Sequence, residues 1–320
     1  MRLRGATPVV ALTALLALTA CGTTEAPADE ESGATLTVTD ARGVEVELDG
    51  PAQRVVTTEW NVTEYLVALG VEPVGAADID GYNTWDTAAP ISDDATDIGT
   101  RGEPSMDTVA SLNPDLVVAT TDLPETAIQQ LEEFVPVLVV QSAELERPLD
   151  RLRENVELVA EATGTEDAAE DLLAQFDAAL ADGAAAIEEA GLAGTPLAFA
   201  DGWVTGGQVT IRPFVSGSQL AAINEELGFT TPWEVEGDPA YGLGSTDVEG
   251  LTALGDTKLL YITSSAETDP FTSLAGNAVW ESLPFVQSGD VHRLPDGIWM
   301  FGGPKAMIQY IDAVVAAVTA

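Results

Sequence analysis

Basic and sulfur-containing side chains are scarce in this chain. It has one histidine, one cysteine and 12 lysine plus arginine residues against 53 acidic residues, a formal net charge of −41. One histidine and one cysteine are too few for a typical directly bound transition metal, so we expect no bare-metal site. A surface this acidic repels phosphate backbones, and we therefore expect no nucleic-acid partner.

Long apolar runs are equally scarce. The one continuous stretch, Val9 to Ala20, is too short to span a bilayer as a helix. Hydrophobic residues nevertheless make up 46% of the 320 residues, enough to bury one or two ordinary cores. The chain is thus predicted to be globular rather than fibrous or disordered.

The amino terminus has the pattern of an export signal. Arg2 and Arg4 precede the apolar run, and Cys21 follows the tripeptide LTA. This arrangement resembles the lipobox of bacterial lipoproteins, which implies a signal peptide over 1–20 and a lipid (palmitate-type) anchor at Cys21 on the extracytoplasmic face of the membrane. The acidic, small-residue segment 21–34 is expected to be a flexible tether. The alternative is a plain secretory signal with a chance cysteine.

Strands and helices are predicted to alternate after this tether. A hairpin is expected over Thr35–Thr39 and Val44–Leu48, where apolar and polar residues alternate around a glycine. Apolar strands then alternate with amphipathic helices, which favours a parallel sheet flanked by helices. The expected strands are Arg54–Thr58, Pro73–Ala76, Asp115–Ala119 and Val137–Val140, and the helices are Val62–Leu69, Ser105–Leu112 and Glu125–Phe134.

A long helix is expected over Glu166–Ala190, about 37 Å in length. Its apolar residues Leu172, Phe176, Leu180 and Ile187 share one face. Strand–helix alternation then resumes, with predicted strands Leu197–Ala200, Gln208–Arg212, Lys258–Ile262 and Asp290–Leu294, and predicted helices Gln219–Leu227, Asp247–Leu254 and Pro304–Val318. The expected fold class is α/β, with two Rossmann-like lobes (35–165 and 191–320) joined by a single long helix (166–190).

Four segments resemble the class III solute-binding proteins of ABC importers. They are TLTVTDARGVEVELDGPAQRVV (35–56), GTRGEPSMDTVASLNPDLVVAT (99–120), STDVEGLTAL (245–254) and VWESLPFVQSGDVHRLPDGIW (279–299). Within that class, the motifs EW (59–60), YNTW (82–85), TRGEP (100–104) and WMFGG (299–303) are most similar to the ferric-hydroxamate, ferrichrome-type siderophore-binding branch.

The resemblance implies a monomeric, non-enzymatic capture protein for iron transport. It would have no intrinsic cofactor, would bind a ferric siderophore between its lobes, and would deliver it to a membrane permease with its ATPase. Heme, cobalamin or a ferric catecholate remain alternative ligands, since the class includes binders of these. One departure leaves the native siderophore open: the branch has a tyrosine shortly before its Pro-Glu pair, whereas this chain reads TTDLPE (120–125).

A ferric siderophore presents a bulky, partly apolar surface with electron-rich chelate oxygens, which calls for aromatic walls and guanidinium groups. Arg101 lies in a loop before a predicted helix and matches the arginine of the hydroxamate branch, and Trp85 is expected in an otherwise polar loop, DIDGYNTWDT. Arg212 and Trp203 are weaker candidates, the former with a structural ion pair as its alternative. By resemblance, the second lobe contributes Tyr241, Trp299 and Phe301.

Two glutamates match family positions that present one carboxylate per lobe to the permease. These are Glu125 and Glu249, and in so acidic a chain the alternative is ordinary solvated surface.

Enzymatic motifs are missing. No nucleophile elbow, phosphate-binding loop or dinucleotide fingerprint follows a predicted strand, and His292 is the one imidazole available. A secreted hydrolase is therefore a distant alternative. A passive adhesin would not need Arg101 and Trp85 in neighbouring loops.

Overall fold

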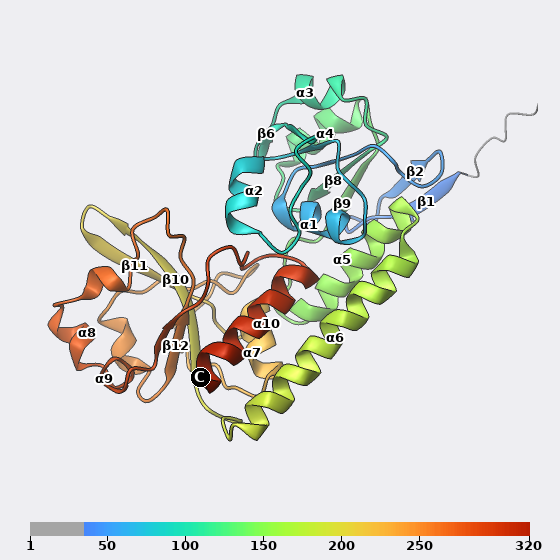
Figure 1. Ribbon diagram of the computed structural model, residues 1–320. Helices are drawn as coiled ribbons and strands as arrows, with labels where there is room; N and C mark the ends of the chain where they lie inside the picture. Colours follow the sequence, from blue (N-terminus) through green and yellow to red (C-terminus); the bar gives the residue numbers. More distant parts are fainter. Residues whose placement is uncertain (1–34) are drawn as a thin grey trace, which may run out of the picture. The chain divides into compact units, whose positions relative to one another are not determined.

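The computed structural model describes residues 35–320, which form one compact unit (Figure 1). The predicted signal peptide, Cys21 and the tether lie outside the described residues. No helix within residues 35–320 is both long enough and apolar enough to cross a membrane.

The described chain opens with the predicted hairpin. Strands β1 (Leu36–Thr39) and β2 (Glu45–Leu48) pair antiparallel, with Leu36 opposite Leu48. Val38 and Val46 point inward while their neighbours are exposed, as the alternating pattern predicted.

A five-stranded, entirely parallel sheet follows. Its strand order is β5 (Thr96–Asp97), β4 (Gly75–Ala76), β3 (Val55–Thr57), β8 (Leu116–Thr120) and β9 (Val137–Val140). The strands β3, β8 and β9 are buried along their whole length, because helices cover both faces of a parallel sheet. The neighbouring helices are α1 (Trp60–Ala68), α2 (Ile79–Trp85), α3 (Met106–Ser111) and α4 (Glu125–Glu132).

The segment that contains Trp85 is helical, which corrects the prediction of a polar loop. Helix α2 ends at Trp85, and the Asp78 side chain accepts a hydrogen bond from Gly81 N at its start. This cap allows a short helix to form in a sequence that lacks apolar periodicity.

Two helices separate the sheets along the chain. Helix α5 (Pro148–Thr163) ends at Gly164, whose φ of 68° is the left-handed conformation that terminates many helices. The predicted long helix is α6 (Glu166–Glu189), and Phe176 and Ile187 are fully buried on its inner face. In Figure 1, α10 (Pro304–Thr319) runs beside α6, and the two helices pack together.

The second sheet has four strands in the order β11 (Gln208–Pro213), β10 (Leu197–Thr205), β12 (Lys258–Tyr261) and β13 (Val291–Arg293). Strands β10 and β11 form an antiparallel hairpin, whereas β12 and β13 pair parallel. The remaining elements are α7 (Gln219–Glu226), the 3₁₀ helices η1 (Gly250–Ala253) and η2 (Thr272–Leu274), α8 (Ala278–Ser282) and α9 (Pro284–Ser288).

Two boundaries differ from the sequence prediction. Strand β10 continues to Thr205 because its second half pairs with β11, a partner that residue propensity does not reveal. The helix expected over Asp247–Leu254 is reduced to the single 3₁₀ turn η1.

One apolar cluster links the two sheets through α6 and α10. It contains Trp60 and Tyr82 from the first half of the chain, Phe176 from α6, and Phe199 and Tyr310 from the second half. Shared burial of this kind favours a stiff connection between the sheets.

Candidate ligand-binding cavity

A cavity of about 430 Å³ draws its lining from residues near both sheets. All seven residues predicted to contact a ligand line it, namely Trp85, Arg101, Trp203, Arg212, Tyr241, Trp299 and Phe301. Residues that are 216 positions apart in sequence, from Trp85 to Phe301, therefore share one hollow. Their roles in binding stay predictions.

Arg101 lies in the turn between β6 (Gly99–Thr100) and β7 (Glu103–Pro104). Its Nη1 atom is 2.8 Å from Glu59 Oε1, and its guanidinium carbon lies 3.9 Å from the ring centre of Trp60. The same group is 5.3 Å from the ring centre of Trp299. Arg101 thus faces the cavity, but it is already paired with a carboxylate and held against an indole.

Aromatic rings of the cavity form a continuous edge-to-face series, in which Trp60 and Trp299 contact Arg101. Trp299 is central, with its ring centre 4.7 Å from Trp60, 6.2 Å from Trp85 and 5.2 Å from Phe301. The series continues from Phe301 to Tyr241 at 5.5 Å. Interlocked rings have little rotational freedom, so these walls are pre-shaped for a bulky ligand.

Arg212, on β11, makes a two-point ion pair with Asp201 on the adjacent strand β10. The structural ion pair that was the alternative interpretation of Arg212 is therefore present. The Arg212 guanidinium also lies 5.9 Å from the Trp203 ring centre. Burial raises the pKa of Asp201, and the pairing with Arg212 opposes that effect. Trp203 is 44% exposed, which is high for an indole.

Tyr241 donates a hydrogen bond from its hydroxyl to Asp122 across the cavity. Burial and the neighbouring carboxylate raise the pKa of Tyr241, so the hydroxyl keeps its proton. Asp122 belongs to the segment TTDLPE, where the family resemblance led us to expect a tyrosine. Tyr241, from the second half of the chain, reaches that region.

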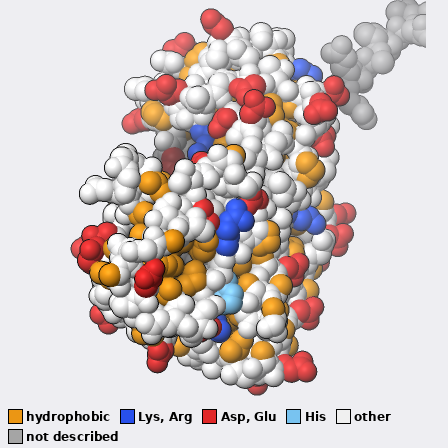
Figure 2. Space-filling view, turned by 60° about the vertical axis from the view of Figure 1, so that its left-hand side comes forward, with side chains coloured by type: hydrophobic (Ala, Val, Ile, Leu, Met, Phe, Trp, Pro, Cys, Tyr) orange, Lys and Arg blue, Asp and Glu red, His pale blue; other side chains and the backbone are white. Residues whose placement is uncertain are grey.

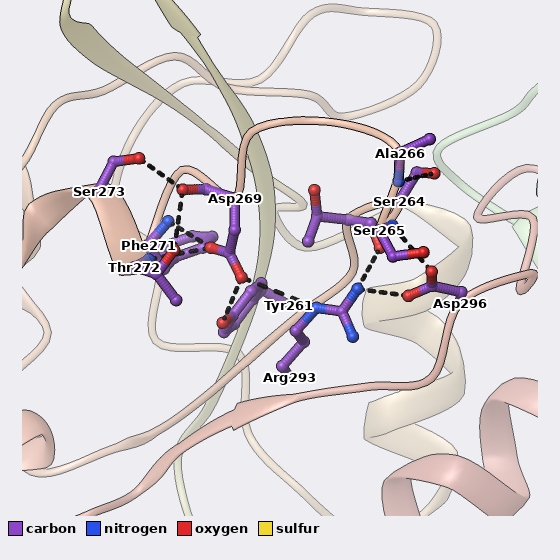
Figure 3. Close-up of polar contacts among 11 residues, drawn as sticks. Tyr261, Ser264, Ser265, Ala266, Asp269, Phe271, Thr272, Ser273, Arg293 and Asp296 are labelled. Atoms are coloured by element: carbon purple, nitrogen blue, oxygen red, sulfur yellow. Dashed lines mark hydrogen bonds and ion pairs between the residues drawn. The ribbon is translucent and has the colours of Figure 1, made fainter.

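A loop after β12 forms another part of the lining through Thr263 and Glu267. Figure 3 shows Arg293 at its base: Nη2 donates to Thr263 O at 3.1 Å, and Nε lies 3.7 Å from Asp269 Oδ2. Arg293 also pairs with Asp296, whose other carboxylate oxygen accepts from Ser265 N. One arginine thereby fixes both ends of the loop that carries Glu267.

Two buried carboxyl groups lie behind the aromatic walls. Glu64, on α1, accepts hydrogen bonds from Gly303 N and, at 3.0 Å, from Ala306 N at the start of α10. Asp86, directly after Trp85, has an Oδ2 atom without a protein donor among residues 35–320. Burial raises the pKa of both groups, and that of Asp86 reaches about 10. Because Glu64 accepts the backbone donors, it carries the charge, and burial together with that charge keeps Asp86 protonated.

The two glutamates predicted to dock on a permease lie on the surface. Glu125 is the first residue of α4, and Glu249 directly precedes η1. Both are exposed, which their predicted role requires but does not establish. No group of three or more histidine, cysteine, aspartate or glutamate residues within 35–320 is arranged to hold a metal ion.

Sequence reasoning did not assign a binding role to several lining residues. Those with charged or aromatic side chains are Glu59, Trp60, Asp122, Asp201 and Glu267. The first two lay within the quoted EW motif, directly after a predicted strand, where α/β ligand sites form. The acidic residues gave no distinguishing signal in a chain with 53 acidic side chains.

Residues 55–297 match the profile of the family described as periplasmic binding protein. A search of curated proteins found the iron(3+)-hydroxamate-binding protein FhuD of Escherichia coli, 24% identical over 83% of this chain and 86% of its own length. It also found the probable siderophore-binding lipoprotein YfiY of Bacillus subtilis, 25% identical over 95% of each chain.

Solved structures agree on the fold. The FhuD protein of Vibrio cholerae bound to Fe³⁺-Desferal has a TM-score of 0.75 and 22% identity, covering 84% of this chain and 98% of its own. FeuA of Bacillus subtilis, a triscatecholate siderophore-binding protein, has a TM-score of 0.70 and 20% identity, covering 88% and 98%. The resemblance inferred from the sequence motifs and the α/β fold class are confirmed.

Proposed function

The chain belongs to the periplasmic binding protein family, and we propose that it captures a ferric siderophore, of the hydroxamate type, in the aromatic cavity. The family consists of binding proteins rather than enzymes, as expected from the missing catalytic motifs. The observation that carries the proposal is the cavity itself, in which a series of contacting aromatic rings includes two, Trp60 and Trp299, that contact the guanidinium group of Arg101. We further propose that the lobes, 35–165 and 191–320, hold the chelate between them, with 166–190 as their connection.

The chemistry of a ferric siderophore suits this lining. The iron is enclosed by chelate oxygens, so the protein contacts a bulky complex through ring faces and hydrogen-bond donors rather than through metal ligands. The relatives named for hydroxamate and siderophore binding support this ligand class. Catecholates, heme and cobalamin are the other outcomes of the binding experiment.

The experiment is a titration of the purified chain with ferric hydroxamates, ferric catecholates, heme and cobalamin. Four tryptophans line the cavity, namely Trp60, Trp85, Trp203 and Trp299, so a bound iron complex should quench much of the fluorescence. Iron-free desferrioxamine is the control. Saturable quenching by heme or cobalamin alone would contradict the proposal, as would no saturable response to any iron chelate.

Replacing Arg101 with alanine should weaken binding of a ferric hydroxamate by about 1–3 kcal/mol, because a charge-assisted hydrogen bond to chelate oxygens is lost. The dissociation constant measured by fluorescence titration gives the result. Since the substitution also leaves Glu59 without its partner, the double variant Arg101→Ala with Glu59→Gln separates the two effects. Arg153→Ala is the matched control, because Arg153 also pairs with a carboxylate and lies over an aromatic ring, but outside the cavity. Unchanged affinity in both Arg101 variants would remove Arg101 from the site.

We also propose a lipid anchor at Cys21 and delivery to an ABC permease. The anchor rests on the lipobox-like sequence and on a relative named as a lipoprotein. Delivery rests on the family and on the exposed positions of Glu125 and Glu249.

Reversing both charges, Glu125→Lys with Glu249→Lys, should reduce siderophore uptake by cells about tenfold, because charge pairs fix the orientation and rate of docking. Siderophore affinity in solution should not change, since neither residue lines the cavity. Glu133→Lys, at another exposed position after α4, is the control. Equal uptake by the double variant and the control would argue against a docking role.

A further inference from the structure

The cavity contains more negative than positive side chains. Its charged lining consists of two arginines, Arg101 and Arg212, and four carboxylates, Glu59, Asp122, Asp201 and Glu267. Glu59 neutralises Arg101 and Asp201 neutralises Arg212. Neither guanidinium therefore offers an uncompensated positive charge to a ligand.

The two remaining carboxylates have no basic partner within residues 35–320. Asp122 accepts a hydrogen bond from the neutral hydroxyl of Tyr241, and Glu267 lies on the exposed loop that Arg293 anchors (Figure 3). Asp122 follows β8 of the five-stranded sheet, whereas Glu267 follows β12 of the four-stranded sheet. A ligand in the cavity thus meets unpaired negative charge from both sheets.

The net charge of the whole chain has the same sign as these two carboxylates, at −41. Figure 2 shows more acidic than basic side chains on the face in view, with one group of basic side chains near its centre. A field of one sign around a low-dielectric cavity raises the local concentration of oppositely charged ligands and lowers that of like-charged ones.

We propose that the cavity selects a positively charged ferric chelate, namely a hydroxamate core that carries a protonated amine. This inference rests on the proposed function and narrows its ligand class. An iron trishydroxamate core is neutral, so an ammonium arm makes the complex a cation that Asp122 and Glu267 attract. A ferric tricatecholate carries three negative charges, which Asp122 and Glu267 repel, and the charges of the two guanidinium groups are already compensated by Glu59 and Asp201.

The test uses three ligands with one iron-binding core. They are ferrioxamine B, whose terminal amine is protonated, its N-acetyl derivative, which is neutral, and its N-succinyl derivative, which is anionic. Fluorescence titration at low salt should give dissociation constants that rise in that order, with about a tenfold or greater span between the cation and the anion. Added salt should reduce this difference in dissociation constant, because salt screens exposed charges.

The double variant Asp122→Asn with Glu267→Gln should reduce the difference between the dissociation constants of the cationic and anionic ligands. Glu133→Gln, an exposed substitution outside the cavity, should keep the full span. The neutral derivative also reports whether the double variant is folded and competent to bind.

The outcomes separate this inference from the proposed function. Equal affinity for all three ligands, or a preference for the anion, would overturn the charge selection and leave siderophore capture intact. If none of the three ligands shows saturable binding, the result would contradict hydroxamate capture and, with it, the proposed charge selection.

Discussion

Replacing Glu64 with alanine should lower the free energy of unfolding by about 3–5 kcal/mol. The side chain is fully buried and accepts hydrogen bonds from Gly303 N and Ala306 N, which have no helical acceptor at the start of α10. Without Glu64, these amides lose their acceptor inside the molecule. The hydrogen bonds that link α1 to the start of α10 are also lost.

Urea unfolding followed by circular dichroism measures this loss. Glu64→Gln should cost less than alanine, because its amide oxygen still accepts one of the two bonds. Glu133→Ala, an exposed position, should change the free energy of unfolding by no more than about 0.5 kcal/mol. An alanine variant at Glu64 that unfolds like the Glu133 variant would mean that the buried contacts contribute little.

Replacing Asp86 with asparagine should change how stability depends on pH. The pKa of Asp86 is raised to about 10, chiefly by burial and then by the charge of Glu64, whereas its ordinary value is 3.8. Between these values the folded state binds one more proton than the unfolded state. This group's contribution to stability is therefore fully present below about pH 4 and falls as the pH rises, by about 1.4 kcal/mol per pH unit.

Asparagine has nearly the same shape, can donate to Glu64 and does not titrate, so the variant lacks this loss. The difference in unfolding free energy between the variant and the natural chain should shift in favour of Asp86→Asn at each step from about pH 5 to about pH 9. Asp93→Asn, at an exposed position, is the control and should show no such trend. Parallel pH curves for the natural chain and Asp86→Asn would show that Asp86 is ionised when buried.

Periodicity and motif order predicted most of the fold. The apolar runs gave β3, β8 and β9, and the four-residue spacing of Leu172, Phe176 and Leu180 gave α6. These signals are local, because the pattern of apolar residues within a strand or helix indicates which of its faces are buried. Helix α2 escaped prediction because a single capping aspartate rather than an apolar face defines it.

Part of the lining of the cavity was also accessible from sequence, but the pairing between its side chains was not. Arg101 stood out as a loop residue directly before a predicted helix, and Trp85 stood out as an aromatic residue in a stretch predicted to be a polar loop. The pairs Arg101–Glu59 and Tyr241–Asp122 join positions 42 and 119 residues apart, and nothing local identifies which acid each will meet. The buried carboxyl groups of Glu64 and Asp86 likewise come from separate segments, and no local pattern indicates that they lie close together.

The paired guanidinium groups also affect how small inorganic anions compete with a ligand. An arginine with its own internal counter-ion has little to gain from a small inorganic anion. Small anions such as chloride and phosphate should therefore compete poorly for Arg101 and Arg212. A ligand that enters the cavity would not first have to displace such anions.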